Sequence, residues 1–550
     1  MSLPHVVMNL SHAIELYDVT PRDGDQASGI NLSTADKLAI ARIDASLGIP
    51  FVETGFPESN DVDRAVFQEL KAHPLQGTKH AAFGMTRRAG VAAERDPGLR
   101  ALIGSGAPAL TVVGKSSRYQ VEKVLRTTVN ENIAMIRDSI QLLSSKSNDV
   151  TYDAEHFFDA WCEDPEYALR TLQTALESGA KRIVLCDTNG GRTPDLVGRA
   201  VSDVRRSFSG ALIGIHPHDD RNLAMANMLA AVQEGARHVQ GTWNGHGERV
   251  GNLDLGVAIA NLHHSGYETL SKESLATLTP TSRQISRIQR QPLDPRQAFL
   301  GDRVASHSGG MHISAVARTN GENPRGNAYE FFDPTTLGNE RSIVASKQGG
   351  RSLVVEIAKS SRLLSPELRD RFLHEPALQV RAADAIKSAS GNGINFGAGM
   401  GSLDLLLLAQ VKENLAPTFT EVSAPKVIDT LGLRSEASMK MNVHGTIEHT
   451  VAEGNGTIDA LFQTLRKALA GRLPETSHVS LVDFHVDKLP ISAEGSASLV
   501  QVSIEFANDA DQWSTTSVSS DMLQASWTAL KEGFEWYCMR KQMAADGRTD

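Results

Sequence analysis

The stretch LIGIHPHDD, residues 212–220, is an apolar run that ends in two histidines one residue apart. In a β-strand, residues i and i+2 point to the same face, so His216 and His218 would lie side by side, about 6–7 Å apart along the strand. Imidazole nitrogen is the commonest neutral ligand for divalent metals. Two histidines at a strand end, capped by Asp219 and Asp220, would give the same pattern without a metal. The rest of the sequence decides between these interpretations.

Runs of similar length and composition recur through the first 250 residues. Eight of them are predicted strands, at residues 14–20, 51–57, 80–86, 109–115, 150–158, 182–188, 212–218 and 238–245. Helical patterns separate most of them, for example at 34–48, 166–180 and 222–236, and the last two end on Gly-Ala, which is a helix-stop signal. Strand and helix alternating eight times over about 250 residues is typical of a (β/α)8 barrel. The sequence therefore predicts an α/β fold that begins with a TIM barrel, residues 1–270.

Polar residues lie at the ends of these predicted strands, where barrel enzymes carry their chemistry. They are Arg22 and Asp23 after the first run, Glu155 in the fifth, Thr188 after the sixth, the two histidines on the seventh, and residues 244–252 after the eighth. Asp23 with the two histidines makes a mixed oxygen and nitrogen donor set that leaves positions free for water and substrate. Mg²⁺, Mn²⁺ and Zn²⁺ all remain possible, although two imidazoles favour the transition metals. Asn252 is either a further oxygen donor or a turn residue after Gly251.

The composition of the 550 residues narrows the class of protein. Hydrophobic residues make up 41% and charged residues 22%, as in soluble globular proteins. A net charge of −10 argues against nucleic acid as a main partner, because no basic surplus is present to neutralise phosphates. No apolar run approaches the roughly 20 residues of a membrane span. The three cysteines have no paired spacing and the first residues lack a signal-peptide pattern, so we expect a cytoplasmic protein.

The remainder of the chain follows a different pattern. Residues 271–420 carry glycine-rich turns and helical stretches, and we predict a mostly helical linker subdomain there. Residues 421–550 contain a weak internal repeat: 438–469 and 496–534 each read as two strands, a polar turn and an amphipathic helix. This pattern predicts a duplicated α+β domain. Because it holds no concentration of catalytic side chains, a regulatory or dimerising role is favoured over a second active site.

Six motifs together resemble a known family. They are DVTPRDGDQ, VETGFPESN, YDAEHFFD, LCDTNGGRTP, GIHPHDD and NGHGERVGN. The combination is similar to the acyl-CoA-condensing α-keto-acid synthases, the family of 2-isopropylmalate, homocitrate and citramalate synthases among the barrel metallolyases. The resemblance extends over nearly the whole chain, since that family also has a linker subdomain and a duplicated C-terminal regulatory domain. YDAEHFFD, DTNGG and GNERSIVASKQGGRS are most similar to the citramalate branch.

The resemblance implies a role for each matching residue. It implies a divalent metal on Asp23, His216 and His218, with Asn252 at or near it. It implies that Arg22 faces the keto oxygen of the substrate, where a fixed guanidinium would stabilise negative charge. A salt bridge from Arg22 to a barrel carboxylate is the plainer interpretation, and the two are compatible.

Four further residues match family positions. The resemblance implies that Glu155 lies beside the substrate, that Thr188 binds the keto-acid carboxylate, and that His312 helps to deprotonate the acetyl methyl group. Tyr329 matches a family tyrosine of the same linker region. Three family positions differ in this chain, at Val19, Pro21 and Asp219, and Asp219 would add a negative charge close to the second histidine.

The expected substrates are acetyl-CoA and an α-keto acid, with pyruvate favoured over 2-oxoisovalerate and 2-oxoglutarate. The resemblance further implies a homodimer and feedback by a branched-chain amino acid, isoleucine if the product is citramalate and leucine if it is isopropylmalate. Two other hypotheses remain open at this point. A barrel aldolase or lyase could use the same metal ligands, and a catalytically silent barrel could serve as a sensor or scaffold.

Overall fold

The computed structural model describes residues 13–307, 310–319, 328–343, 345, 349–411, 416–429, 432–489, 498–508 and 511–545. The chain divides into two compact units. The first comprises Met1–Val304 and Pro334–Glu340, and the second comprises Ala305–Asp333 and Arg341–Asp550. Within the described residues, no helix combines the length and the apolar character that a membrane span requires.

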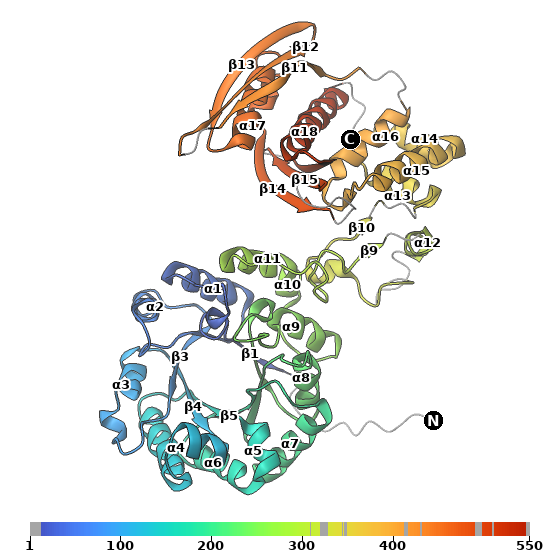
Figure 1. The fold of residues 1–550 in the computed structure, drawn as a ribbon. Helices are drawn as coiled ribbons and strands as arrows, with labels where there is room; N and C mark the ends of the chain where they lie inside the picture. The colour runs from blue at the N-terminus through green and yellow to red at the C-terminus, as the bar shows by residue number, and fades with distance from the viewer. Residues whose placement is uncertain are drawn as a thin grey trace, which may run out of the picture. The chain divides into compact units, whose positions relative to one another are not determined.

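The first unit is a closed barrel of eight parallel strands, seen end-on in Figure 1. The strands are β1 (Glu15–Asp18), β2 (Phe51–Gly55), β3 (Lys79–Met85), β4 (Ala109–Lys115), β5 (Val150–Glu155), β6 (Arg182–Asp187), β7 (Leu212–Pro217) and β8 (His238–Gly241). They pair in sequence order, and β1 closes the barrel against β8. The predicted (β/α)8 fold is confirmed, and each predicted run contains its strand to within one residue. Strand residues are almost all buried, as in a sheet covered on both faces.

Helices surround the barrel (Figure 1). They are α1 (Thr34–Leu47), α2 (Asp61–Ala72), α3 (Pro97–Gly104), α4 (Val129–Ser144), α5 (Phe157–Glu163), α6 (Pro165–Glu177), α7 (Pro194–Ser207), α8 (Ala224–Gln233), α9 (Leu255–His264), α10 (Lys272–Leu275) and α11 (Leu278–Gln289). Their ends follow local chemistry. Helix α1 begins at Ser33, which forms a capping box with Asp36, and it ends at Gly48 with φ of 82°, a backbone angle that glycine adopts without strain.

A pair of buried carboxyl groups ties α1 to the seam between β1 and β8. Asp18 at the end of β1 and Asp44 in α1 are both 0% exposed. Asp44 accepts a hydrogen bond of 2.9 Å from the indole Nε1 of Trp243, and Asp18 accepts one of 2.9 Å from the backbone N–H of Thr20. Burial raises the pKa of Asp18 to about 6 and the pKa of Asp44 well above its usual value, where the neighbouring Asp18 charge adds to the effect. Asp44 is therefore the proton donor of the pair and Asp18 the acceptor.

We expect this pair to make the barrel less stable as pH rises. The folded state binds both protons more tightly than the unfolded chain, so their contribution is complete below about pH 4, falls as Asp18 titrates near 6, and falls further as the Asp44 proton is lost at higher pH. Asp44→Asn keeps a hydrogen-bond donor to Asp18 and should remove the part of this dependence that lies above about pH 6, with a gain on the order of 1–3 kcal/mol at pH 8. Urea unfolding of both proteins between pH 5 and 8.5 measures it. Parallel stability curves for the two proteins would contradict a shared proton.

The second unit begins with helices. They are α12 (Gly310–Thr319), α13 (Arg351–Ser360), α14 (Pro366–His374), α15 (Pro376–Gly391) and α16 (Met400–Val411). Two short parallel strands, β9 (Ser306–His307) and β10 (Ser342–Ile343), accompany them. The mostly helical linker predicted from the sequence is confirmed for this part of the chain.

The C-terminal part contains two units of three antiparallel strands followed by a helix. The first is β11 (Phe419–Ile428), β12 (Ser435–Val443), β13 (Thr446–Gly454) and α17 (Thr457–Ala470), and the second is β14 (Ser480–Lys488), β15 (Val500–Ala507), β16 (Gln512–Ser519) and α18 (Met522–Ala545). The predicted duplication is confirmed, but the prediction of two strands per repeat is wrong. The first strand of each repeat was missed because most of its side chains are exposed, so it lacks a buried face in the sequence pattern.

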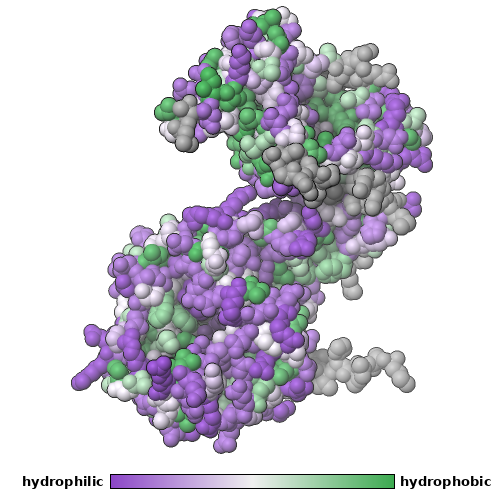
Figure 2. Space-filling model, in the orientation of Figure 1, coloured by the Kyte–Doolittle hydropathy of each residue, from purple (hydrophilic) through white to green (hydrophobic). Residues whose placement is uncertain are grey.

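One apolar core joins both repeats to α13–α16. The surfaces of the two units differ in character. Figure 2 shows mostly hydrophilic residues over the barrel unit. In the second unit, exposed apolar side chains occur on the sheet β11–β13, namely Val422, Ile428, Ile447 and Val451.

Candidate metal centre and active site

A pocket of about 390 Å³ opens at the carboxyl ends of the barrel strands. Six of the residues singled out from the sequence line it, namely Arg22, Asp23, Glu155, Thr188, His216 and His218. These residues come from four different strands or the loops that follow them, and only the closed barrel brings them together. The polar residues that follow successive strands in the sequence therefore share one cavity.

The turn after β1 places Arg22 and Asp23. The backbone N–H groups of Arg22, Asp23 and Gly24 lie 3.2, 2.8 and 3.2 Å from the carbonyl oxygen of Val19. Val19 itself is 0% exposed and packs in an apolar cluster with Tyr17. A buried valine thus anchors a tight turn from which both polar side chains reach the pocket. Val19 is one of the positions at which this chain differs from the family. The difference lies in the residue that supports the turn, and Arg22 and Asp23 are still present on it.

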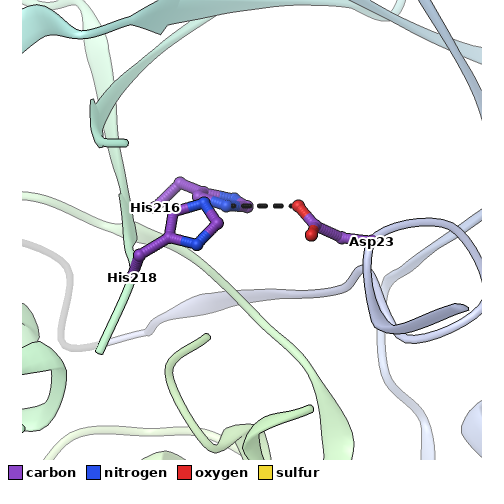
Figure 3. A group of neighbouring side chains, drawn as sticks. All are labelled: Asp23, His216 and His218. Atoms are coloured by element: carbon purple, nitrogen blue, oxygen red, sulfur yellow. Dashed lines mark ion pairs between the residues drawn. The ribbon is translucent and has the colours of Figure 1, made fainter. Parts of the chain in front are cut away.

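Asp23, His216 and His218 converge on one point (Figure 3). Each offers a ligand atom, and these atoms lie within 4.8 Å of one another. The Nε2 atom of His216 is 3.5 Å from Oδ2 of Asp23, and the two imidazole centroids are 5.2 Å apart. All three side chains are buried. A buried carboxylate facing two imidazoles is a donor set that suits Mn²⁺, Zn²⁺ or a related divalent ion.

Asn252 joins this group through backbone pairing. It forms an antiparallel bridge with His218, and its Nδ2 donates to Oδ1 of Asp23 at 3.2 Å. The Oδ1 atom of Asn252 and the Nδ1 atom of His218 are buried without a hydrogen-bond partner among the described residues. Buried polar atoms are normally paired, and an unpaired oxygen and nitrogen beside a carboxylate are what a cation would satisfy. The residues present therefore fit a divalent metal.

Glycines let the loop after β8 fold tightly around Asn252. A Cβ on Gly247 would lie 2.1 Å from Nδ2 of Asn252, and a Cβ on Gly251 would lie 2.1 Å from the carbonyl oxygen of Gly245. Gly251 also has φ of 123°, which side chains rarely allow. The close approach of backbone to the Asn252 amide requires glycine at both positions.

The electrostatics keep these side chains in the forms that bind cations. Burial would raise the pKa of Asp23, but the Arg22 guanidinium and the two histidines outweigh it and hold the pKa at about 2. Burial and the neighbouring His216 lower the pKa of His218 to about 3. At neutral pH the site therefore presents an ionised carboxylate and a neutral His218 imidazole, as metal coordination needs.

Arg22 is held on three sides. Its Nε donates to Oε1 of Glu53 at 2.5 Å, and its Nη1 donates to Oδ2 of Asp23 at 3.0 Å. The guanidinium carbon lies 3.8 Å from the centre of the Phe83 ring. Glu53 is fixed in turn by the hydroxyl of Tyr17, which donates to Oε2 at 2.9 Å. The planar group is thus locked beside the two histidines, with donors left to face the pocket.

Glu155 and Thr188 lie on the neighbouring wall. Oε2 of Glu155 forms an ion pair of 2.5 Å with Nζ of Lys115. Oγ1 of Thr188 accepts a hydrogen bond of 2.8 Å from the backbone N–H of His156, so its own proton can be donated into the pocket. Lys115, at the end of β4, lines the same pocket, and together the three side chains make a polar wall.

His312 and Tyr329 belong to the second unit. Their rings stack with centroids 3.9 Å apart and an interplanar angle of 15°. His307 lies nearby, 6.3 Å from His312 between centroids, and its Nε2 is 3.0 Å from Oε1 of Glu330. The structure brings the two predicted residues together with each other, and their role at the metal site stays a prediction.

Sequence reasoning missed several polar residues of the barrel interior. Glu53 and Asp153 are both buried, and Asp153 lines the pocket. Burial, with the charge of Glu53, raises the pKa of Asp153 to about 8. A signal was present, because each carboxylate stands in the middle of an otherwise apolar strand run, and Asp153 precedes Glu155 by two positions and shares its face.

Asp219, which follows the second histidine, supports the start of the next helix. Its Oδ1 accepts a hydrogen bond of 2.8 Å from the backbone N–H of Ala224, the first residue of α8. Asp219 is absent from the described pocket lining. The residue after the second histidine thus supports a helix start, where a carboxylate is favourable, and adds no ligand to the site.

Family models match both parts of the chain. Residues 13–285 match the HMGL-like family, and residues 401–538 match the LeuA allosteric (dimerisation) domain. The first range covers all eight barrel strands with α10 and most of α11. The second covers most of α16, the strands β11–β16, α17 and most of α18.

Curated relatives match nearly the full length. The (R)-citramalate synthase of Aquifex aeolicus is 36% identical over 97% of this chain and 99% of its own length. That of Synechocystis sp. is 40% identical over 95% of each chain. The 2-isopropylmalate synthase of Lysinibacillus sphaericus is 26% identical over 97% of this chain and 99% of its own. The identity to the citramalate synthases, carried across both units, shows that the chain belongs to the citramalate synthase family of enzymes.

Proposed function

We propose that this enzyme condenses acetyl-CoA with an α-keto acid, pyruvate, and hydrolyses the thioester to give citramalate and free CoA, at a divalent metal held by Asp23, His216, His218 and Asn252. The observation that carries the proposal is the buried cluster at the barrel mouth, with two donor atoms that have no partner among the described residues. When bound, the metal would act as a Lewis acid that polarises the keto carbonyl.

The reaction sets clear demands on the protein. A base removes a proton from the acetyl methyl group, and the methyl carbon then forms a bond to the keto carbon. The keto oxygen becomes a hydroxyl by taking up a proton. Water adds to the thioester carbonyl, and CoA leaves as the thiol. The first step needs the most help, because a thioester α-proton is weakly acidic in water and a positioned base must act with preorganised charge.

Arg22 is the group best placed to stabilise negative charge on the keto oxygen. Its contacts with Glu53, Asp23 and Phe83 fix the guanidinium before substrate arrives. A preorganised donor of this kind costs no reorganisation in the transition state. We assign Arg22 to the oxyanion that develops as the new carbon–carbon bond forms.

The other predicted residues divide the remaining tasks. Thr188 has a free hydroxyl proton for the carboxylate of the keto acid, since its oxygen already accepts from His156. Glu155, paired with Lys115, lies beside the substrate. His312 is the base for the acetyl methyl group, and Tyr329, stacked on its ring, orients it.

Pyruvate is favoured as the acceptor because the chain is more similar in sequence to citramalate synthases than to 2-isopropylmalate synthases. The citramalate synthases of Aquifex aeolicus and Synechocystis sp. are 36% and 40% identical to this chain, whereas the 2-isopropylmalate synthases of Lysinibacillus sphaericus and Listeria monocytogenes are 26% and 28% identical. The acceptor wall includes Phe83, Met85 and Val113, which would contact the substituent on the keto carbon. The alternatives are 2-oxoisovalerate and 2-oxoglutarate.

A thiol-release assay tests the proposal directly. The enzyme is incubated with acetyl-CoA alone and with pyruvate, 2-oxoisovalerate or 2-oxoglutarate, before and after treatment with EDTA and readdition of Mn²⁺. We expect CoA release that requires pyruvate and is lost on chelation. If CoA is released only with one of the other keto acids, that acid is the acceptor and pyruvate is not. If CoA is released with none of them, the lyase or scaffold hypothesis is favoured.

We further propose that residues 421–550 form a regulatory domain that dimerises and binds isoleucine, consistent with the match to a LeuA allosteric (dimerisation) domain. Inhibition needs only different affinities for active and inactive states, and a coupling of about 1–3 kcal/mol suffices. Titrating isoleucine and leucine against the full chain, with sedimentation to measure the oligomeric state, is the test. If neither amino acid binds or alters turnover, dimerisation is the domain's only role.

A further inference from the structure

Gln240 lies directly behind one of the histidines of the metal site. Ile215 of β7 pairs with Val239 of β8, so His216 and Gln240 are the next neighbours along the two strands. Oε1 of Gln240 is 2.8 Å from Nδ1 of His216. The Gln240 side chain is 0% exposed, and it is absent from the described lining of the pocket. Its contact is therefore with the back of the imidazole and not with the substrate space.

The amide of Gln240 is oriented by its other contacts. Its Nε2 donates to Oδ1 of Asp153 at 3.2 Å, and it lies 3.4 Å from Nε2 of His238. An amide nitrogen can only donate, so Nε2 of His238 must accept. The remaining amide atom, Oε1, can only accept, so the Nδ1 atom of His216 must carry a proton.

The orientation of the Gln240 amide is set by His238 and Glu15, which lie further along the inside of the barrel. Nδ1 of His238 is 2.8 Å from Oε2 of Glu15, and Nη2 of Arg182 donates to Oε1 of Glu15 at 2.8 Å. Burial would raise the pKa of Glu15, but the hydrogen bonds from Arg182 and His238 outweigh it and hold the pKa at about 2. A permanently ionised Glu15 accepts the proton of His238 Nδ1 and leaves His238 Nε2 as an acceptor. Burial also lowers the pKa of His238, so this ring is neutral.

The chain of contacts from Arg182 through Glu15, His238 and Gln240 thus assigns every proton as far as His216. We propose that Gln240 is the positioning residue that fixes His216 in its Nδ1–H tautomer, so that the Nε2 lone pair faces Asp23 and a metal. The inference rests on the proposed metal site and deepens it. A histidine that binds metal through one nitrogen commonly donates from the other to an oxygen, and loss of such a partner costs about 10–100-fold in metal affinity or activity.

Metal-free protein gives the first test. In ¹⁵N-histidine-labelled apo-enzyme, two-bond ¹H–¹⁵N correlations distinguish the two neutral tautomers, and the His216 signal is identified by its absence in His216→Ala. We expect the Nδ1–H form in the wild type and a mixture, or the Nε2–H form, in Gln240→Leu. The Nε2–H form as the main species in wild-type apo-enzyme would overturn the proposal. This readout does not depend on whether the site binds metal.

Calorimetric titration of apo-enzyme with Mn²⁺ gives the second test. We expect Gln240→Leu to bind about 10–100-fold more weakly, and Gln240→Glu, which keeps an acceptor oxygen for His216, to recover most of the loss. The matched control is Gln379→Leu in the second unit, where a buried glutamine donates to the carbonyl oxygens of Phe372 and Leu373. That variant should lower stability and leave Mn²⁺ affinity unchanged.

The outcomes distinguish a failure of the metal site from a failure of the role proposed for Gln240. If the wild type binds no Mn²⁺, the metal site itself fails, and the tautomer measurement still decides the role of Gln240. If the wild type binds and Gln240→Leu binds equally well, the positioning role fails while the metal site stands. Should Gln240→Leu fail to fold, Gln240→Glu and the wild-type tautomer remain as readouts.

Discussion

His218→Ala is expected to lower kcat for citramalate formation by at least about a thousandfold, or about 4 kcal/mol of transition-state stabilisation. The substitution removes one of the three converging ligands and leaves space for water beside Asp23. The same loss is expected for His216→Ala, and for the wild type after chelation. Thiol release in the presence of pyruvate, measured together with bound metal, gives the result.

The matched control for this prediction is His73→Ala. His73 follows α2, and its side chain is 71% exposed in an ion pair with Glu69, so the same chemical change there should leave both kcat and metal content untouched. Circular dichroism on each variant verifies that the barrel is folded. Near-normal turnover of folded His218→Ala without metal would remove the basis for the metal site.

Arg22→Lys is expected to lower kcat by about 10²–10³, or roughly 2–4 kcal/mol, the scale of losing one preorganised donor to an oxyanion. Lysine keeps the charge but lacks the planar fork that reaches Glu53 and Asp23 together while stacking on Phe83. The effect should fall mainly on kcat, since the group acts on charge that develops during the reaction. Steady-state kinetics with varied pyruvate separate kcat from KM.

Arg87→Lys provides the comparison for Arg22→Lys. Arg87 is also a buried barrel arginine, paired with Glu131 and Asp138, but it is absent from the described pocket lining. We expect Arg87→Lys to reduce thermal stability with kcat unchanged. If Arg22→Lys behaves in the same way, Arg22 is a structural ion-pair partner and the oxyanion assignment is wrong.

The barrel could be predicted from the sequence because its signal is repeated and local. Each strand is a short buried run, and each polar group at a strand end is close in sequence to that run. The rule that strand ends meet at one mouth then places residues as distant as Asp23 and His218 together. No long-range information beyond the fold is needed for this step.

The interior partners could not be predicted in the same way. Gln240 is one polar residue in a short strand, and nothing local shows that its amide meets His216 on one side and His238 on the other. Such contacts depend on the register between neighbouring strands. The missed strands β11 and β14 have a related cause, since exposed strands leave no alternation of buried and exposed residues to detect.

The glycines around Asn252 bear on how this enzyme can change over evolutionary time. Because side chains at Gly247 and Gly251 would collide with the Asn252 amide and with the carbonyl of Gly245, the loop after β8 should tolerate almost no substitution. Met85 and Val113 line the pocket from β3 and β4 and are not among the groups that hold Arg22 or Asn252, whereas Phe83 stacks on Arg22. We therefore expect a library of single substitutions to show a sharp division, with acceptor preference drifting through Met85 and Val113 and the β8 loop remaining fixed. New specificity would then arise without any change to the metal-binding side of the pocket.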